Sequence, residues 1–295
     1  MPSKKVILTL SFALISAPIF AYSWTTPTNL GANINSSSED TEPGITPTGN
    51  TLYFSSKRGG NYDIWQSIYS GGRWQPATRT PYVNTGSYDG NPAFLQSTYL
   101  EMYLTSNRRG NMDIYQRVYR SGSWQTPSRL PSTVNTAYSE YGCGLYRRSG
   151  RATMMFASRK PGGKGQHDIW ATEYRGGWVS AWHVSRPSSS ANDVGPTVTL
   201  NGAYMYFASN RSGGYGNYDL YVSRWTGIYW GTASNLGSKI NTSYNEIYPG
   251  VTANGQRLYF ASNRPGGRGG TDIWMTLNTT AVTPTSLGRV KALYY

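Results

Sequence analysis

Acidic residues recur at regular intervals along the sequence. Of the fourteen Asp and Glu residues, ten occupy two repeated positions. The first position starts an Asp-Ile-Trp triplet or a close variant of it, and its members are Asp63, Asp113, Asp168, Asp219 and Asp272. The second position lies three residues before a proline or its counterpart, and its members are Asp40, Asp89, Glu140, Asp193 and Glu246. Gathered carboxylates repel one another unless they are hydrogen-bonded, protonated or neutralised, so the second set is a candidate for a site.

The acidic positions belong to a longer internal repeat. Five segments align, and they are LYFSSKRGGNYDIW from Leu52, MYLTSNRRGNMDIY from Met102, MMFASRKPGGKGQHDIW from Met154, MYFASNRSGGYGNYDLY from Met205 and LYFASNRPGGRGGTDIW from Leu258. The spacing of 50 to 55 residues suits one four-stranded propeller blade per repeat. The composition agrees, because 34 Gly and 25 Tyr favour strands and tight turns over helices. We predict an all-β, five-bladed propeller.

Turn residues divide each repeat into strands. An inner strand after the acidic residue ends at a hairpin such as Asn254-Gly255, and the second strand runs into an Arg/Gly loop. The third strand starts at the repeated Asp, and a glycine turn introduces a fourth strand that begins at Trp. The segment from Trp24 has this fourth-strand pattern without three strands before it, so we expect it to complete the fifth blade and close the ring. Closure by Thr283–Leu287 is the alternative.

This topology places all ten carboxylates on one face of the disc. The Asp40 set is expected near the axis, with basic residues in the adjacent loops and tyrosines between them. The predicted ligand-binding residues are therefore Asp40, Asp89, Glu140, Asp193, Glu246, Arg58, Arg108, Lys160, Arg211, Arg264, Tyr88, Tyr141 and Tyr248. A polar pocket of this kind suits a carbohydrate or a peptide segment. The alternative is that these carboxylates are tied to neighbouring backbone, and for the Asp63 set we expect such a structural role, with loop N–H groups and the loop Arg as partners.

Hydrolysis is one chemistry that the axial carboxylates allow. Five-bladed propellers include glycoside hydrolases with acid and base carboxylates in an axial pocket, and Asp40, Asp89 and Glu140 form a similar series. Because the same position is acidic in blades four and five, repetition explains the series without catalysis. We therefore expect no catalytic residues.

Other chemistries have little support in the sequence. His167 and His183 lack a metal-ligand spacing, no Gly-x-Ser-x-Gly element is present, and Gly162-Gly163-Lys164-Gly165 lacks the P-loop pattern. We expect no metal and no cofactor. The formal net charge is +13, yet the arginines are spread over the blades, so we expect no nucleic-acid partner.

The first 21 residues have the pattern of a secretory signal peptide. Lys4 and Lys5 precede an apolar run that ends at Phe20, and cleavage is expected after Ala21. The apolar run is short for a bilayer span, so we expect no membrane anchor after cleavage. The predicted organisation is a signal peptide (1–21) and one propeller domain (22–295). Cys143 is the single cysteine, and we expect it to be a small buried residue.

The repeat resembles a known class. The form E-x-x-P…N-G…LYFASNRPGGxGxxDIW is similar to the WD40-like β-propeller repeat of TolB-type and cell-envelope proteins. The resemblance implies a rigid disc used in the envelope for protein or glycan contacts. TolB-type propellers have six repeats and a separate N-terminal domain, so a TolB role is not carried over. We predict an exported, periplasmic or secreted, non-catalytic binding or scaffolding module for an envelope protein or glycan; the alternative is a carbohydrate-active protein, either a lectin or a glycoside hydrolase.

Overall fold

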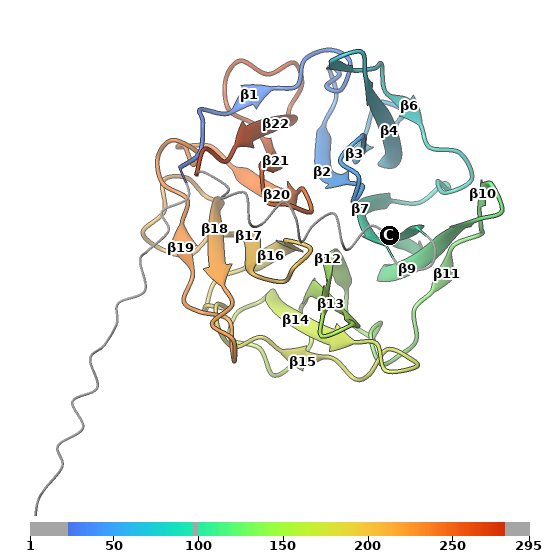
Figure 1. The fold of residues 1–295 in the computed structure, drawn as a ribbon, viewed down its shortest axis with the longest axis vertical. Helices are drawn as coiled ribbons and strands as arrows, with labels where there is room; N and C mark the ends of the chain where they lie inside the picture. The colour runs from blue at the N-terminus through green and yellow to red at the C-terminus, as the bar shows by residue number, and fades with distance from the viewer. Residues whose placement is uncertain (1–22, 97–99, 281–295) are drawn as a thin grey trace, which may run out of the picture.

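The computed structural model describes residues 23–96 and 100–280, which form five antiparallel sheets around a central axis (Figure 1). Blade 1 comprises β2 (Asp40–Ile45), β3 (Thr51–Ser56), β4 (Asp63–Ser70), β5 (Arg73–Trp74) and β6 (Thr78–Arg79). Blade 2 comprises β7 (Asp89–Gln96), β8 (Leu100–Arg109), β9 (Asn111–Arg120), β10 (Ser123–Trp124) and β11 (Ser128–Arg129). Blade 3 comprises β12 (Glu140–Arg148), β13 (Arg151–Ser158), β14 (Asp168–Glu173) and β15 (Trp182–His183). Blade 4 comprises β16 (Asp193–Val198), β17 (Tyr204–Ser209), β18 (Asp219–Arg224) and β19 (Ser234–Asn235).

The N-terminal strand completes the fifth blade, as the sequence predicted. Blade 5 comprises β20 (Glu246–Val251), β21 (Arg257–Ser262), β22 (Asp272–Leu277) and β1 (Thr28–Asn29). Thr28 pairs with Met275 and Asn29 pairs with Trp274, and a bridge between Trp24 and Asn278 extends the pairing. This pairing covers the edge of β22, which would otherwise be open. The alternative closing segment, Thr283–Leu287, lies outside the described residues. In blades 1 and 2 the fourth strand is divided into two short pieces, β5 and β6 in blade 1 and β10 and β11 in blade 2, and both pieces pair with the third strand. The prediction of a five-bladed propeller with four strands per blade is confirmed in this sense.

The hydrophobic core lies between the blades. The second strand of each blade is buried on both faces, because each of its faces packs against side chains of a neighbouring sheet. One cluster joins Leu52 and Phe54 of blade 1 to Tyr259 and Ile273 of blade 5, so the core continues across the closure. Apolar burial of this kind supplies the main favourable free energy of folding.

Tryptophans connect neighbouring blades at their outer hairpins. The Trp that opens the fourth strand packs edge-on against a tyrosine of the preceding blade, and these pairs are Trp74–Tyr259, Trp178–Tyr103, Trp230–Tyr146 and, at the closure, Trp24–Tyr206. Edge-to-face pairs are a favourable aromatic geometry. Each of these tryptophans therefore holds two blades together.

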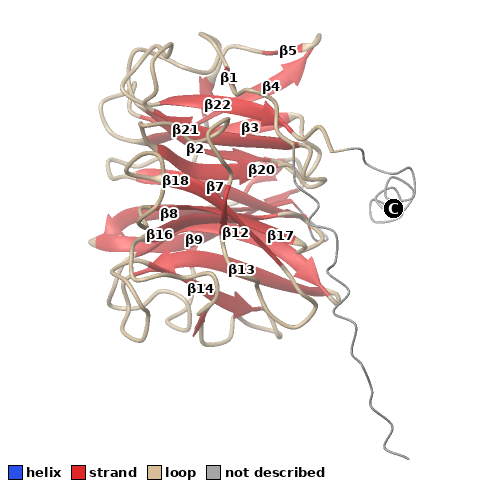
Figure 2. Ribbon diagram, turned by 90° about the vertical axis from the view of Figure 1, so that its left-hand side faces the viewer, coloured by secondary structure: helices blue, strands red, loops and turns tan. Residues whose placement is uncertain are grey.

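The loops gather at the two ends of the strands (Figure 2). We call the end that holds the starts of the inner strands the carboxylate face, and the other end the hairpin face. No helix in the described part of the chain is long and apolar enough to cross a membrane.

Candidate functional site

A row of three polar residues crosses each blade at the carboxylate face. In blade 1 Asp40 pairs with Ser56, and Ser56 pairs with Asp63. The equivalent rows are Asp89–Ser106–Asp113, Glu140–Ser158–Asp168, Asp193–Ser209–Asp219 and Glu246–Ser262–Asp272. All ten repeated carboxylates therefore lie at one end of the strands.

The inner carboxylates are buried and hydrogen-bonded. Oδ2 of Asp40 accepts hydrogen bonds from the backbone N–H (2.6 Å) and hydroxyl (2.8 Å) of Ser36, while Oδ1 accepts one from Arg58 Nη2 at 2.5 Å. The same arrangement recurs for the pairs Asp89–Arg108, Asp193–Arg211 and Glu246–Arg264. All five inner carboxylates are 0% exposed. A buried carboxylate is tolerated because charge-assisted hydrogen bonds replace its hydration.

This burial corrects the placement of the Asp40 set around an axial opening. Asp40, Asp89, Glu140, Asp193 and Glu246 hold the entry of each inner strand against the loop of the same blade, and none of them lines the axial pocket described below. Their basic partners Arg58, Arg108, Arg211 and Arg264 are turned toward these carboxylates and toward the ring of an aromatic residue, and they do not line the pocket either. Their contacts agree with the alternative interpretation, because each of the five carboxylates accepts a hydrogen bond from a backbone N–H four residues before it.

Blade 3 departs from this pattern because it has Lys160 where the other blades have Arg. Nζ of Lys160 donates to the carbonyl oxygen of Ala181 at 3.1 Å and lies 3.9 Å from the ring centroid of Trp170. Glu140 instead accepts from Ser158 and Thr136. Burial raises the pKa of Glu140 above its ordinary value and lowers that of Lys160.

The five residues of the Asp63 set are buried, as a structural role requires, but their side-chain partners differ from those expected. The loop Arg pairs with the inner carboxylate, and the side-chain partner of the third-strand Asp comes from the fourth strand. These partners are Arg79 for Asp63, Arg129 for Asp113, Asn235 for Asp219 and Asn29 for Asp272. In blade 3 the corresponding residue is His183, whose Nε2 lies 3.4 Å from Oδ1 of Asp168 without a hydrogen bond. The expected loop N–H bonds occur in blades 3 to 5, for example from Lys164 to Asp168. Those blades have longer Gly-rich loops that fold back over the Asp, whereas the shorter loops of blades 1 and 2 are accompanied by an Arg.

A second ring of equivalent residues faces the axis, two positions after each inner carboxylate. Here the inner strand bulges, and all five residues have a left-handed backbone. The residues and their φ angles are Glu42 (56°), Asn91 (51°), Gly142 (60°), Gly195 (58°) and Tyr248 (52°). A Cβ at Gly195 would lie 2.9 Å from the Tyr248 ring, so this position has no room for a side chain. In this ring, blades 1, 2 and 5 contribute side chains and blades 3 and 4 contribute glycines.

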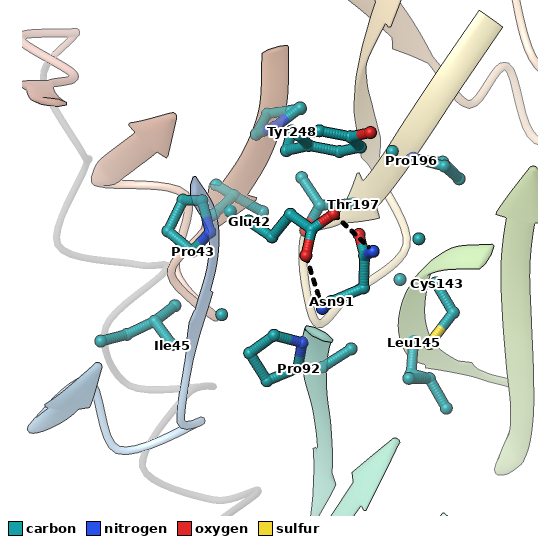
Figure 3. A pocket seen from close by; sticks show the side chains of 18 of the residues that line it. Glu42, Pro43, Ile45, Asn91, Pro92, Cys143, Leu145, Pro196, Thr197 and Tyr248 are labelled. Carbon is teal, nitrogen blue, oxygen red and sulfur yellow. Dashed lines mark hydrogen bonds between the residues drawn. The ribbon is translucent and has the colours of Figure 1, made fainter. Parts of the chain in front are cut away.

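Glu42 is the carboxylate at the axis. Its oxygens accept hydrogen bonds from Ser55 Oγ (2.5 Å), Tyr88 Oη (2.5 and 2.6 Å), Asn91 N (2.9 Å) and Asn91 Nδ2 (2.7 Å). Figure 3 shows Glu42, Asn91 and Tyr248 around the axis, with dashed lines for the bonds between Glu42 and Asn91. Burial raises the pKa of Glu42 despite these donors. The network fixes the side chains of Tyr88 and Asn91.

Above this ring, a pocket of about 440 Å³ opens on the carboxylate face. We call it the axial pocket, and it is lined by Glu39, Thr41, Glu42, Tyr62, Tyr88, Asn91, Thr105, Met112, Ser139, Tyr141, Arg159, His167, Ile247, Tyr248 and Thr271. Below the ring, a narrow cavity of about 70 Å³ runs between the inner strands, and Glu42, Asn91 and Tyr248 line both spaces. These three residues form the floor of the axial pocket.

The walls of the axial pocket differ in charge. Blade 1 contributes Glu39 and Glu42, and the hydroxyl of Tyr62 donates to Glu39. Blade 3 contributes Arg159 and His167, whose ring lies 5.4 Å from that of Tyr141. Burial lowers the pKa of His167, so its imidazole is neutral at pH 7. The pocket thus has an acidic side, a basic side and aromatic walls.

The sequence identified some of the residues that line this pocket. Tyr88, Tyr141 and Tyr248 line it as predicted, but Glu39, Glu42, Asn91 and Arg159 were missed. A signal for the floor was present, because the residue before the inner-strand Pro changes from Glu42 to Asn91 to Gly195 to Tyr248 while its surroundings repeat. Within residues 23–96 and 100–280, no group of three or more His, Cys, Asp or Glu side chains could hold a metal ion.

Comparisons with known proteins show the fold. No protein-family model matches the sequence, and no curated protein matches it. The chain is similar to the α-L-arabinofuranosidase from Lactobacillus brevis, with 12% identity over 84% of this chain and 92% of that one and a TM-score of 0.57. It is similar to the GH43 endo-arabinanase from Bacillus licheniformis, with 18% identity over 82% of this chain and 95% of that one and a TM-score of 0.57. It is also similar to TolB from Acinetobacter baumannii, with 19% identity over 82% of this chain but 55% of that one and a TM-score of 0.50. The chain thus shares a β-propeller fold with glycoside hydrolases and with TolB.

Proposed function

We propose that this protein binds a saccharide in the axial pocket. The observation that carries the proposal is the pocket itself, in which four tyrosines surround a space of about 440 Å³ that has fixed polar groups at its floor. Pockets of about 300–1,000 Å³ with aromatic walls and a few oriented polar groups are typical of small-ligand sites. Tyrosine rings can stack on a sugar while carboxylate, amide and guanidinium groups bond its hydroxyls.

Of the two partners that the sequence left open, the pocket favours the glycan. A stable protein–protein interface buries about 800 Å² on each partner, which a single pocket of this size does not offer. The glycoside hydrolases with the same fold include an arabinofuranosidase, an endo-arabinanase and a xylan β-1,4-xylosidase, so arabinan and xylan oligosaccharides are the first ligands to test. We place this function outside the cytoplasm, periplasmic or secreted, because the first 21 residues have a signal-peptide pattern.

Calorimetric titration of residues 22–295 with these oligosaccharides tests the proposal. The variant Tyr141→Ala removes one wall and should weaken binding at least tenfold. Tyr82→Ala is the matched control, because Tyr82 is 88% exposed and does not line the pocket. Equal binding by wild type and the folded Tyr141→Ala variant would overturn the proposal, as would the absence of binding to any glycan on an array.

Hydrolysis of the bound saccharide is a second candidate function. The pocket contains two carboxyl groups in different environments, and burial raises the pKa of one of them, Glu42, as a general acid requires. Asp40, Asp89 and Glu140, the trio suggested by the sequence, are buried away from this pocket, so hydrolysis would depend on Glu39 and Glu42. Release of reducing ends from arabinan or xylan by wild type, lost in Glu39→Gln, is the expected result. If the protein binds the saccharide but releases no reducing ends, the binding proposal stands and hydrolysis of that polymer is excluded.

A further inference from the structure

A second pocket, of about 460 Å³, lies between blades 3 and 4 away from the axial floor. We call it the interblade pocket. Its main walls are Tyr146, Arg148, Trp182, Arg186, Trp225 and Tyr229. Arg148 ends the inner strand β12, and Tyr229 lies in the hairpin between β18 and β19, so the pocket extends to the hairpin face, opposite the axial pocket.

Residues that break the fivefold repeat converge on this pocket. In the fourth strand, Trp182 occupies the position that holds Thr28, Thr78, Ser128 and Ser234 in the other blades. In the β18–β19 hairpin, Ile228, which is 83% exposed, stands where the hairpins of blades 1 to 3 have Gly72, Gly122 and Gly176, and Tyr229 follows it. Inner strand β12 is the longest of the five, with nine residues against eight in β7 and six in β2, β16 and β20, and its last residue is Arg148. Because the repeat explains none of these residues, their convergence indicates a local function.

The interblade pocket is positively charged and aromatic. The guanidinium carbon of Arg148 lies 3.5 Å from the ring centroid of Trp225, and its Nη2 donates to the carbonyl oxygen of Gly202 at 2.8 Å. The guanidinium of Arg186 lies over the ring of Tyr229, 4.9 Å from its centroid. Within the described residues neither arginine forms an ion pair with a carboxylate, and no Asp or Glu lines the pocket. Two positive charges without a counter-charge favour an anionic ligand.

We propose that the interblade pocket binds an acidic sugar residue of a polysaccharide. The sugar carboxylate would accept hydrogen bonds from Arg148 and Arg186, whose planar guanidinium groups are already oriented by the aromatic rings beneath them. The half-exposed rings of Trp182 and Tyr229 would stack on the sugar ring. The proposal does not depend on the function of the axial pocket, because no residue lines both pockets.

The test is titration of residues 22–295 with trigalacturonate and with its neutral counterpart, galactotriose. Trigalacturonate should bind at least tenfold more tightly, and its affinity should fall between 50 and 200 mM salt because charges on opposite partners are screened. Arg186→Gln and Trp182→Thr should each weaken binding of trigalacturonate about tenfold. The Trp182→Thr variant should fold normally, because Thr78 occupies the same position in blade 1.

Two controls separate this site from general charge and from the axial pocket. Arg73→Gln removes an exposed positive charge in the β4–β5 hairpin of blade 1 and should leave trigalacturonate binding unchanged. Tyr141→Ala alters only the axial pocket and should also leave it unchanged. Equal affinity for the neutral sugar, binding unaffected by Trp182→Thr, or tighter binding of a triglutamate peptide would each overturn the proposal.

Discussion

Five equivalent residues share a left-handed backbone at the axis, but only two of them are glycine. Such a conformation costs a residue with a side chain about 1–2 kcal/mol, so Glu42, Asn91 and Tyr248 are retained against a local penalty. Each of them lies at the floor of the axial pocket, where Glu42 and Asn91 also bond to each other. Three of the six described non-glycine residues with a left-handed backbone therefore lie side by side at the pocket floor, which supports a functional role for it.

Cys143, next to the axial Gly142, should be chemically inert in the folded protein. Its thiol lines the narrow cavity between the inner strands, and burial raises its pKa to about 12. The reactive thiolate is then about 10⁻⁴ of the total at pH 8. We expect no labelling by iodoacetamide at pH 8 in native buffer and complete labelling in 6 M guanidinium chloride. Rapid labelling of the native protein would contradict this burial.

Lys160→Arg should stabilise blade 3 by about 1 kcal/mol, because it supplies the guanidinium that pairs with the inner carboxylate in the other four blades. The pH dependence gives a sharper test. Burial raises the pKa of Glu140 above its ordinary value of 4.5, so the folded state holds this proton more tightly than the unfolded state. The free energy of unfolding therefore falls as pH rises from the unfolded pKa through the folded one.

In Lys160→Arg this fall should be smaller, since the guanidinium stabilises the charged carboxylate. Urea denaturation between pH 4 and pH 7 measures it. Arg264→Lys, the reverse change beside Glu246 in blade 5, should make the fall steeper. An identical pH dependence in all three proteins would refute the assignment to these residues.

The outer hairpins of blades 1, 3 and 4 each contribute a Trp that packs against a Tyr of the preceding blade. Trp178 is 7% exposed, and its ring packs against Tyr174 of its own hairpin and Tyr103 of blade 2. Replacing a buried Trp by Ala removes this packing and leaves a cavity. We expect Trp178→Ala to lower the free energy of unfolding by about 3–5 kcal/mol, measured by urea denaturation. Trp182→Ala is the matched control, because Trp182 is 46% exposed, and it should cost less than about 1 kcal/mol.

At the scale of the whole molecule, the repeat made the fold predictable, but the site was only partly predictable. Five aligned segments with turn residues at fixed offsets were enough to predict the blades, the shared face of the ten carboxylates and the closing strand. The prediction of the axial carboxylate was wrong for one reason. A β-bulge after Asp40 turns Glu42, two residues later, toward the axis, and the repeat pattern alone does not show whether Asp40 or Glu42 faces it. Likewise, spacing alone did not show that Arg58 pairs with Asp40 while Arg79 pairs with Asp63.

Closure of the ring by the N-terminal strand makes a prediction about the whole molecule. A chain that begins at Leu30 lacks Trp24 and β1, so β22 becomes an open edge and Tyr206 loses its aromatic partner. We expect this truncation to lower the melting temperature by about 5 °C or more and to promote self-association, measured by calorimetry and size-exclusion chromatography. Removal of residues 281–295, which include the alternative closing segment, should leave both properties unchanged. The opposite result, a stable protein without β1 and an unstable one without residues 281–295, would assign closure to the C-terminal segment.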